Sequence, residues 1–227
     1  MAADLQLSRP AAIRALVFDM DGTLVDSMPA HARSWEAFGR THALPFGVDE
    51  ILRRTTGRNG VECIRELFGQ DVSDERALAL VAEKESHYRA IFAADFRPVP
   101  GVHEAIAAAQ AAGLQVAIAT AGDRHNIAFT LEHLALPRAP DVVVGGDEGL
   151  RGKPEPDLFL EAARRLGRAP RECLVFEDAP FGIEAARRAG MQAVAICTTH
   201  EPQELAGDHV IAQVADYRAL LQAGFFA

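Results

Sequence analysis

Two aspartates one residue apart, Asp19 and Asp21, stand near the start of the chain. They follow the apolar run 13–17 and precede Gly22, so a buried strand and a turn would hold them close together. Like charges this near raise one pKa or recruit a metal ion, and carboxylate oxygens are the ligands that Mg²⁺ prefers. One carboxylate can attack an electrophile while the other transfers protons. The pair therefore predicts a phosphoryl-transfer site.

Further polar residues follow later apolar runs, where each predicted strand ends. A hydroxyl and free backbone N–H groups after 115–119 suit phosphate oxygens, a single lysine stands in a turn beyond 141–144, and a second acidic pair follows 173–176. Ligands bind outside the carboxyl ends of the strands in an open parallel sheet, so these groups would meet at one rim. In chain order they are Thr120, Ala121, Lys153, Glu177 and Asp178.

Each of these groups alone has a simpler explanation. Thr120 and the pair Glu177 and Asp178 could cap the helices that follow them, and Lys153 could be a solvated turn residue. Two unpaired carboxylates after a buried strand, at Asp19 and Asp21, are harder to explain without a function. The combination in this order is more specific than any member.

The elements that would position these residues alternate between strand and helix. Short apolar runs at 13–17, 115–119, 141–144, 173–176 and 193–196 show little polar alternation, as strands buried on both faces do. Helical patterns end just before Gly113, Gly167 and Gly190, and glycine is the usual helix stop. This alternation predicts an α/β fold: a Rossmann-like core with a parallel sheet and helices on both faces. A last strand (209–211) and a helix close the chain.

Residues 27–95 break that rhythm, because they hold helical patterns and no convincing strand. We expect helices within 29–40, 61–68 and 74–92, and the stiff segment 96–101 then returns to the sheet. The predicted organisation is a core of residues 1–26 and 96–227 with an inserted helical cap domain at 27–95. The insert would cover the active edge of the sheet.

Composition excludes several classes of protein. The chain has 227 residues with 49% hydrophobic and 24% charged residues, as ordinary globular proteins do. A net charge of −9 argues against nucleic-acid binding, and no apolar run approaches the roughly 18 residues of a membrane span.

Residues 1–10 resemble a loose leader without a signal core. Cys63, Cys173 and Cys197 form no metal spacing, and we expect the last two to be buried thiols of a cytoplasmic protein. With no heptad or exposed apolar stripe, the default is a monomer.

Taken together, the motifs resemble those of the haloacid dehalogenase superfamily of phosphotransferases. The resemblance spans nearly the whole chain, and an insert after the first motif looks like the type I cap of that family. Segments 152–154 and 175–183 narrow the likeness to the β-phosphoglucomutase-like branch, which holds sugar-phosphate phosphatases and mutases. The motifs are Asp19-Met20-Asp21-Gly22-Thr23, Thr120, Lys153 and Glu177-Asp178.

The resemblance implies a role for each motif residue. Asp19 would be the nucleophile that becomes an aspartyl-phosphate, and Asp21 the acid and base. Mg²⁺ would be held by Asp19, Asp178 and the backbone carbonyl of Asp21, with Glu177 in or near its coordination shell. The phosphoryl oxygens would be bound by Thr120, the N–H of Ala121 and Lys153. Positive charge is required because a phosphomonoester dianion repels a carboxylate nucleophile.

Four more residues are candidates for substrate binding, and each has an alternative. His31 resembles a hinge histidine that contacts Asp21 or the substrate, but it could be a packing residue beside Trp35. Lys84 matches a cap lysine that points into the cleft, or else lies on a solvated helix face. Arg58, in the glycine-rich segment 57–60, and Arg124, just past Thr120, could also reach the substrate.

The predicted function is a Mg²⁺-dependent phosphatase of a small phosphorylated metabolite, most simply a sugar phosphate. Gly60 stands where the mutases of this branch place a phosphate-gripping arginine, and this departure favours a phosphatase. A hexose-phosphate mutase that uses the same aspartyl-phosphate is the second hypothesis. A non-catalytic binding module is the third. Asp21 argues against a dehalogenase, since the dehalogenases of the superfamily lack this second aspartate.

Overall fold

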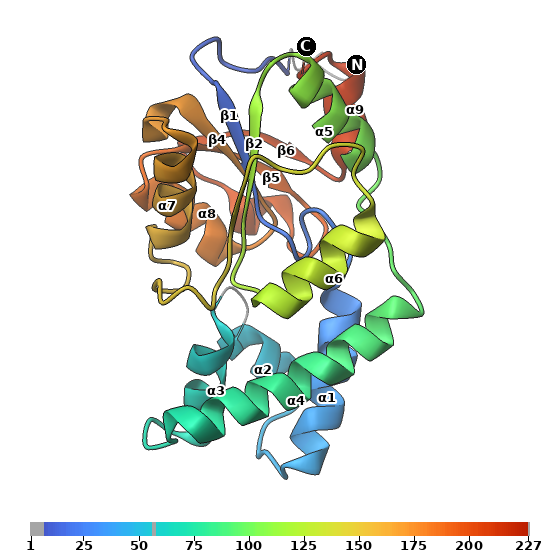
Figure 1. Cartoon of the computed structure of the whole chain (residues 1–227), viewed down its shortest axis with the longest axis vertical. Helices are drawn as coiled ribbons and strands as arrows, with labels where there is room; N and C mark the ends of the chain where they lie inside the picture. Colours follow the sequence, from blue (N-terminus) through green and yellow to red (C-terminus); the bar gives the residue numbers. More distant parts are fainter. Residues whose placement is uncertain (1–6, 56–57, 227) are drawn as a thin grey trace.

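The structure is a computed structural model that describes residues 7–55 and 58–226. Within these residues, six parallel strands form one sheet in the order β3-β2-β1-β4-β5-β6 (Figure 1). The short strands of the centre are buried on both faces, as parallel sheets require. The predicted α/β fold is thereby confirmed. Most of the predicted leader, residues 1–6, lies outside the described residues. The strands are β1 (Ala15–Phe18), β2 (Gln115–Ala119), β3 (Val142–Val144), β4 (Cys173–Glu177), β5 (Gln192–Ile196) and β6 (Val210–Val214).

Helices cover both faces of the sheet, as Figure 1 shows. The side chains of Leu16 and Phe18 enter the core beneath α5 (Val102–Ala111), α6 (Arg124–Leu134) and α9 (Tyr217–Gln222). The intervening Ala15 and Val17 face α7 (Asp157–Leu166) and α8 (Pro180–Arg188). This alternation follows from the two-residue period of a strand. Two short 3₁₀ helices, η1 (Pro170–Glu172) and η2 (Pro202–Leu205), complete this part of the chain.

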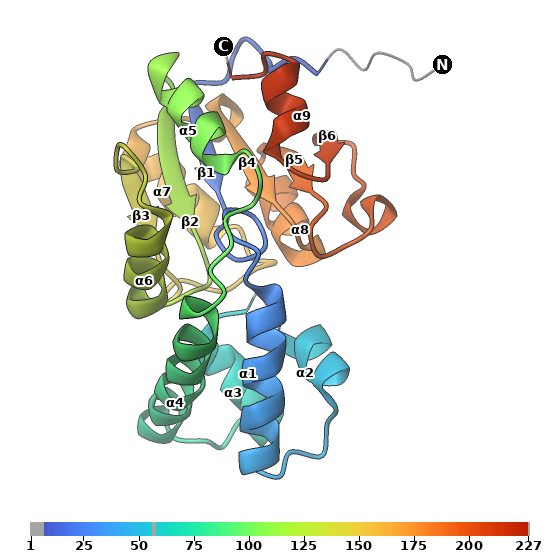
Figure 2. The ribbon, with the colours of Figure 1, turned by 90° about the vertical axis from the view of Figure 1, so that its right-hand side faces the viewer.

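Of the helices that the structure describes between β1 and β2, α5 packs on the sheet and the other four lie apart from it: α1 (Met28–Thr41), α2 (Val48–Thr55), α3 (Gly60–Phe68) and α4 (Asp74–Ala93). They stand beyond one end of the sheet (Figure 2) and have a hydrophobic core of their own, which includes Trp35, Phe38, Ile64 and Leu80. We call α1–α4 the cap. The boundaries predicted for it, 27 and 95, remain a prediction.

Two helices, α2 and α6, are absent from the patterns predicted above. The helix α2 is short and buries only Ile51 and Thr55. The start of α6 follows the polar end of β2, and Asp123 caps it by accepting the N–H groups of His125 and Asn126. Both helices begin in polar sequence, where apolar periodicity is weakest.

The three cysteine side chains differ in burial. Cys63 and Cys173 are buried and Cys197 is partly buried, and all are free thiols. Cys173 is therefore the buried residue that the sequence predicts, while Cys197 is less enclosed.

Among the described residues, no helix combines the length and the apolar character that crossing a bilayer requires.

Candidate active site

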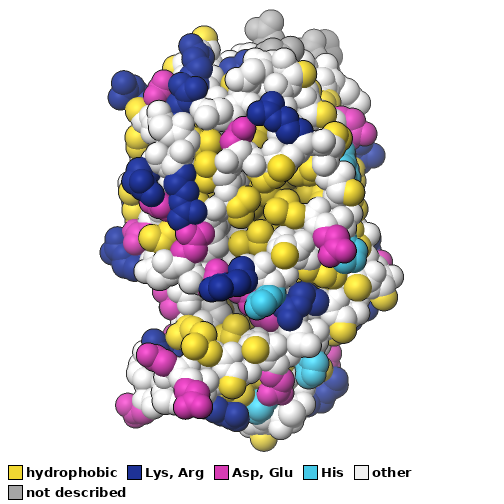
Figure 3. Space-filling view, viewed as in Figure 1, with side chains coloured by type: hydrophobic (Ala, Val, Ile, Leu, Met, Phe, Trp, Pro, Cys, Tyr) yellow, Lys and Arg dark blue, Asp and Glu magenta, His cyan; other side chains and the backbone are white. Residues whose placement is uncertain are grey.

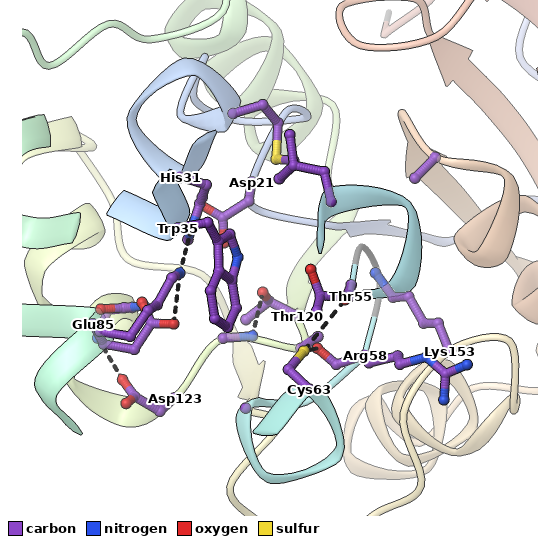
Figure 4. A pocket seen from close by; sticks show the side chains of 18 of the residues that line it. Asp21, His31, Trp35, Thr55, Arg58, Cys63, Glu85, Thr120, Asp123 and Lys153 are labelled. Atoms are coloured by element: carbon purple, nitrogen blue, oxygen red, sulfur yellow. Dashed lines mark hydrogen bonds and ion pairs between the residues drawn. The ribbon is translucent and has the colours of Figure 1, made fainter. Parts of the chain in front are cut away.

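The carboxyl ends of three neighbouring strands bring the predicted residues together. Phe18 pairs with Ile118 on one side and with Phe176 on the other, so the residues that follow these positions meet at one rim. Asp19 is the first residue after β1, Thr120 is the first after β2, and Glu177 ends β4. One pocket is lined by every predicted site residue except Arg124: Asp19, Asp21, His31, Arg58, Lys84, Thr120, Ala121, Lys153, Glu177 and Asp178 (Figure 4).

Lys153 stands between two carboxylates at the bottom of this pocket. Its ammonium group contacts Oδ1 of Asp19 and donates to Oε1 of Glu177 at 2.7 Å. Only 2% of the residue is exposed. Although burial alone lowers the pKa of Lys153, the two carboxylates hold it above its ordinary value. The alternative of a solvated turn lysine is therefore wrong.

Three buried carboxylates form a cluster that suits a divalent cation. Oxygen atoms of Asp19, Glu177 and Asp178 all lie within 4.8 Å of one another. Burial raises the pKa of Asp19 to about 7, against the opposing charge of Lys153. The pKa of Asp178 is raised well above its ordinary value by burial and by its acidic neighbours. One lysine leaves this cluster short of positive charge, and hard oxygen donors are what Mg²⁺ requires. The donor set therefore fits Mg²⁺.

The members of the cluster are not equally available to a cation. Both oxygens of Glu177 already accept hydrogen bonds, one from Lys153 and one from the N–H of Ala179 at 2.7 Å. Oδ1 of Asp178 accepts from the hydroxyl of Thr23 at 3.2 Å, and its other oxygen contacts the hydroxyl of Thr199. Because Glu177 accepts from the charged ammonium group of Lys153 whereas the side chain of Asp178 accepts from hydroxyl groups, we expect Glu177 to act mainly by orienting Lys153.

Asp21 stands apart from this cluster and is held by cap residues. Its Oδ1 accepts from the hydroxyl of Ser27 at 2.7 Å and from that of Tyr88 at 3.2 Å, and it lies 3.3 Å from Nε2 of His31. Burial works to raise the pKa of Asp21, but His31, Ser27 and Lys84 outweigh it and lower the pKa to about 2. In this arrangement Asp21 is ionised in the protein without substrate.

Thr120 and Ala121 face the same pocket from the end of β2. Oγ1 of Thr120 accepts the N–H of Gly122 at 3.0 Å. A hydroxyl both accepts and donates, so this bond leaves its proton available to an oxygen in the pocket. Gly146 packs so tightly here that a Cβ atom on it would lie 2.1 Å from the carbonyl oxygen of Ala121.

The candidate residues His31, Arg58 and Lys84 also line the pocket. The His31 ring stacks on Tyr88 at a centroid distance of 3.8 Å, while Nδ1 of His31 lies 2.8 Å from Nζ of Lys84. His31 therefore packs and makes polar contacts at once. Lys84 is 2% exposed, which rules out a solvated helix face. Nε of Arg58 is buried without a hydrogen-bond partner among the described residues.

Two predicted positions fall outside this geometry. Arg124 is exposed, and its Nε pairs with Oδ2 of Asp147 at 2.6 Å, so the structure does not bring it into the pocket. Gly57 lies outside the described residues.

Several residues at the site are not singled out by the motifs. Ser27 opens α1 but makes no capping bond, because its hydroxyl is used on Asp21. Thr199 lies just beyond β5, so the rule that selects strand ends would also select it. Tyr88 contacts Asp21 across 67 residues of sequence, and no local spacing indicates that contact.

The chain is similar in sequence to a family of hydrolases and to several phosphatases. A family model described as "haloacid dehalogenase-like hydrolase" matches residues 13–190. Hexitol phosphatase A of Escherichia coli (strain K12) is 35% identical over 189 residues, covering 81% of this chain and 82% of that protein. Fructose-1-phosphate phosphatase YqaB of the same organism is 36% identical over 186 residues, covering 79% and 94%.

Solved structures agree with these relatives. The crystal structure of CbbY from Rhodobacter sphaeroides, in complex with phosphate, has a TM-score of 0.76 and 27% identity, covering 92% of this chain and 96% of that chain. The motifs, the fold and these relatives point the same way. This chain belongs to the haloacid dehalogenase-like hydrolases, and within them to the β-phosphoglucomutase-like branch.

Proposed function

We propose that this protein is a Mg²⁺-dependent phosphatase that hydrolyses a phosphorylated carbohydrate through an aspartyl-phosphate on Asp19. The observation that carries the proposal is the position of the Lys153 ammonium group between Asp19 and Glu177. A buried cation beside a buried carboxylate makes attack on a phosphate dianion feasible. The two similar phosphatases are named for a hexitol and for fructose 1-phosphate, which supports a phosphorylated carbohydrate as the substrate.

In the first step, an oxygen of Asp19 attacks the phosphorus atom and the bond from phosphorus to the sugar oxygen breaks. Lys153 and the Thr120 hydroxyl stabilise the negative charge on the phosphoryl oxygens. The leaving sugar oxygen takes a proton from the carboxyl group of Asp21, which has to bind that proton before the step because Asp21 is ionised in the protein without substrate. When bound, Mg²⁺ would supply further positive charge at Asp19 and Asp178.

In the second step, the aspartyl-phosphate is hydrolysed. Asp21, now a carboxylate, takes a proton from a water molecule, whose oxygen attacks the phosphorus atom. The bond between phosphorus and the Asp19 oxygen breaks, so inorganic phosphate leaves and both aspartates return to their starting state. The three hydrogen-bonding groups around Asp21, on Ser27, His31 and Tyr88, favour the carboxylate that this step requires.

A mutase would need a grip for a second phosphate at the position of Gly60. A Cβ atom on Gly60 would lie 2.8 Å from Cγ1 of Val81, so this position has no room for a long basic side chain unless Val81 moves. Arg58 remains the basic residue of this loop that lines the pocket. This packing supports hydrolysis over isomerisation.

The proposal is tested with a panel of sugar phosphates that includes fructose 1-phosphate and β-glucose 1-phosphate. Free phosphate and isomerised sugar phosphate are measured together, with Mg²⁺ and with a chelator. We expect phosphate release that stops on chelation. Replacing Asp19 by Asn should abolish turnover, and Lys153→Met should slow it by about 10²–10³-fold, as loss of one transition-state donor does.

The matched control is Lys153→Arg, which keeps the charge but changes its shape, and should retain a part of the rate. An Asp19→Asn protein with full Mg²⁺-dependent activity would overturn the mechanism. Isomerised sugar phosphate with little free phosphate would instead establish the mutase.

A further inference from the structure

The side-chain amide of Asn126 joins the cap to the sheet-bearing part of the molecule. Asn126 lies in the first turn of α6 and is 2% exposed. Its Oδ1 accepts from Nη1 of Arg89 at 2.7 Å, and its Nδ2 donates to Oε2 of Glu85 at 2.6 Å. Arg89 and Glu85 lie one turn apart on α4. We call these three residues the Asn126 clasp.

The clasp closes one side of the pocket. Asn126 and Glu85 both line the pocket, and Figure 4 shows Glu85 on the side opposite Lys153. On the Lys153 side, Oε1 of Glu62 in α3 accepts the N–H of Gly152 at 3.2 Å. The outer surface where α6 meets α4 carries charged side chains of both signs and a histidine (Figure 3). Polar contacts therefore hold the cap on both sides of the pocket.

The clasp is also connected to Asp21 through buried polar groups. Oε1 of Glu85 accepts from Nζ of Lys84 at 2.9 Å, and Nζ of Lys84 lies 2.8 Å from Nδ1 of His31. Nε2 of His31 lies 3.3 Å from Oδ1 of Asp21. If Glu85 moved, Lys84 would lose one of its partners. Lys84 is the residue that connects Glu85 to His31 and so to Asp21.

We propose that Asn126 is a positioning residue for the reaction at Asp21. Its amide keeps the cap closed and holds Glu85 where Lys84 and His31 stay against Asp21. The effect on turnover rests on the proposed function, whereas the effect on cap position does not.

Only a neutral amide satisfies both partners of this clasp. One end must accept from a cationic arginine and the other must donate to an anionic glutamate, and an amide carries one group of each kind. Asn126→Asp would place two carboxylates against each other. Adding Glu85→Gln exchanges the roles, because the new glutamine donates to the new aspartate while Arg89 still donates to it. The double variant should therefore restore the clasp.

The test measures cap position and turnover in the full chain. Leu78 on α4 is 59% exposed and Leu160 on α7 is 38% exposed. Replacing both by Cys in a Cys197→Ser background gives a spin-label pair that reports the distance from cap to core, since the remaining thiols are buried. Turnover is followed as kcat and KM separately, on the best sugar phosphate. Thermal melting checks that each variant is folded.

We expect Asn126→Asp to shift the distance distribution to longer values and to lower kcat/KM about tenfold or more, since a buried charged group loses its hydrogen bond. The double variant Asn126→Asp with Glu85→Gln should regain most of both. Arg89→Met, which leaves the Glu85 contact in place, should give a smaller shift. His125→Asp adds the same charge on an exposed neighbour and should change neither.

An Asn126→Asp protein with the wild-type distance distribution and kcat/KM would overturn the proposal. A double variant that recovers neither property would also overturn it. If Asn126→Asp does not fold, Arg89→Met decides, and an unchanged distance in that variant overturns the clasp. A wild-type protein that releases no phosphate from any sugar phosphate would overturn the proposed function, and the positioning role at Asp21 with it. The distance distributions would still decide whether the clasp holds the cap.

Discussion

At the scale of single residues, the two motif aspartates differ in their surroundings more than in their spacing. Asp19 is enclosed with Lys153 and two more carboxylates, and burial raises its pKa to about 7. The pKa of Asp21 is lowered to about 2, because hydrogen-bonding partners and positive charge outweigh its burial. Because a nucleophile has to be ionised and a proton donor protonated, the proposed roles require that Lys153 and a bound cation favour the ionised form of Asp19 and that Asp21 binds a proton before the first step.

Asp21→Asn should separate these roles. We expect kcat on an alkyl phosphate such as a sugar phosphate to fall about 10²–10⁴-fold, because the leaving alkoxide then lacks its proton donor. Hydrolysis of p-nitrophenyl phosphate should lose less in the first step, because nitrophenolate leaves without a proton. Burst kinetics with both substrates measure the difference. The control Asp49→Asn, on the exposed start of α2, should leave both rates unchanged, and equal losses on both substrates would contradict the acid role.

At the scale of elements, close packing between α8 and β4 holds the acidic pair in place. A Cβ atom on Gly182, in the first turn of α8, would lie 1.7 Å from Oε1 of Glu177. Glu177 is the partner of Lys153, so the helix start and the ammonium group of Lys153 are linked through one carboxylate. Only a glycine lets α8 begin this close to the strand end.

Gly182→Ala should therefore damage the site from outside it. Glu177 has to move, Lys153 loses its partner, and overpacking costs about 1–3 kcal/mol of the free energy of unfolding. We expect at least a roughly tenfold loss of kcat, as when one electrostatic contact is removed. Urea unfolding and initial rates measure the two effects. Gly47→Ala is the matched control, because nothing lies within 4 Å of a Cβ atom there. A Gly182→Ala protein as active as this control would refute the link.

At the scale of the whole molecule, the cap has a hydrophobic core of its own, while its residues Ala30, Tyr88 and Phe92 pack into the core of the sheet. Polar groups also join the two parts beside the pocket. Glu85 is the clearest case, since it contacts Lys84 within the cap and Asn126 across the boundary. Burial acts to raise the pKa of Glu85, but Lys84, His31 and Asn126 lower it overall. Its ionised form is therefore favoured by folding.

The sign of the resulting pH dependence follows from the lowered pKa. The contribution of Glu85 is fully present above the ordinary carboxyl pKa of 4.5 and is lost as the pH falls through the folded-state value below it. Near pH 7, Glu85→Gln should lower the free energy of unfolding by about 1.5–3 kcal/mol, the range for hydrogen bonds to charged groups. The difference from the wild type should shrink as the pH falls below 4.5.

Urea unfolding of both proteins at a series of pH values measures this difference. Glu132→Gln, exposed on α6, serves as the control and should match the wild type at every pH. A difference between Glu85→Gln and the wild type that grows on acidification would contradict the assignment.

The gathering of the candidate site residues at one rim of the sheet was predictable from the amino-acid sequence, because these residues directly follow apolar strands. Asp19, Thr120 and Glu177 each stand at the end of an apolar run, and the parallel pairing of β1 with β2 and β4 brings them together. The local signal is strong because a buried strand is a short apolar run and a charge after it has few explanations. The α/β class and the helical insert follow from the same patterns.

Beyond the contact with His31 that the family resemblance implies, the environment of Asp21 and the closure of the pocket were decided by tertiary contacts. Tyr88 reaches Asp21 over 67 residues, and Asn126 reaches Glu85 over 41 residues. The sequence allows Lys84 to face either the cleft or the solvent. The rotation of α4 against α1 and α6 decides which, and it turns Lys84 into the pocket. Helical periodicity indicates which residues share a face, but it does not determine which neighbour that face meets. The packing of the cap on the sheet supplies that information.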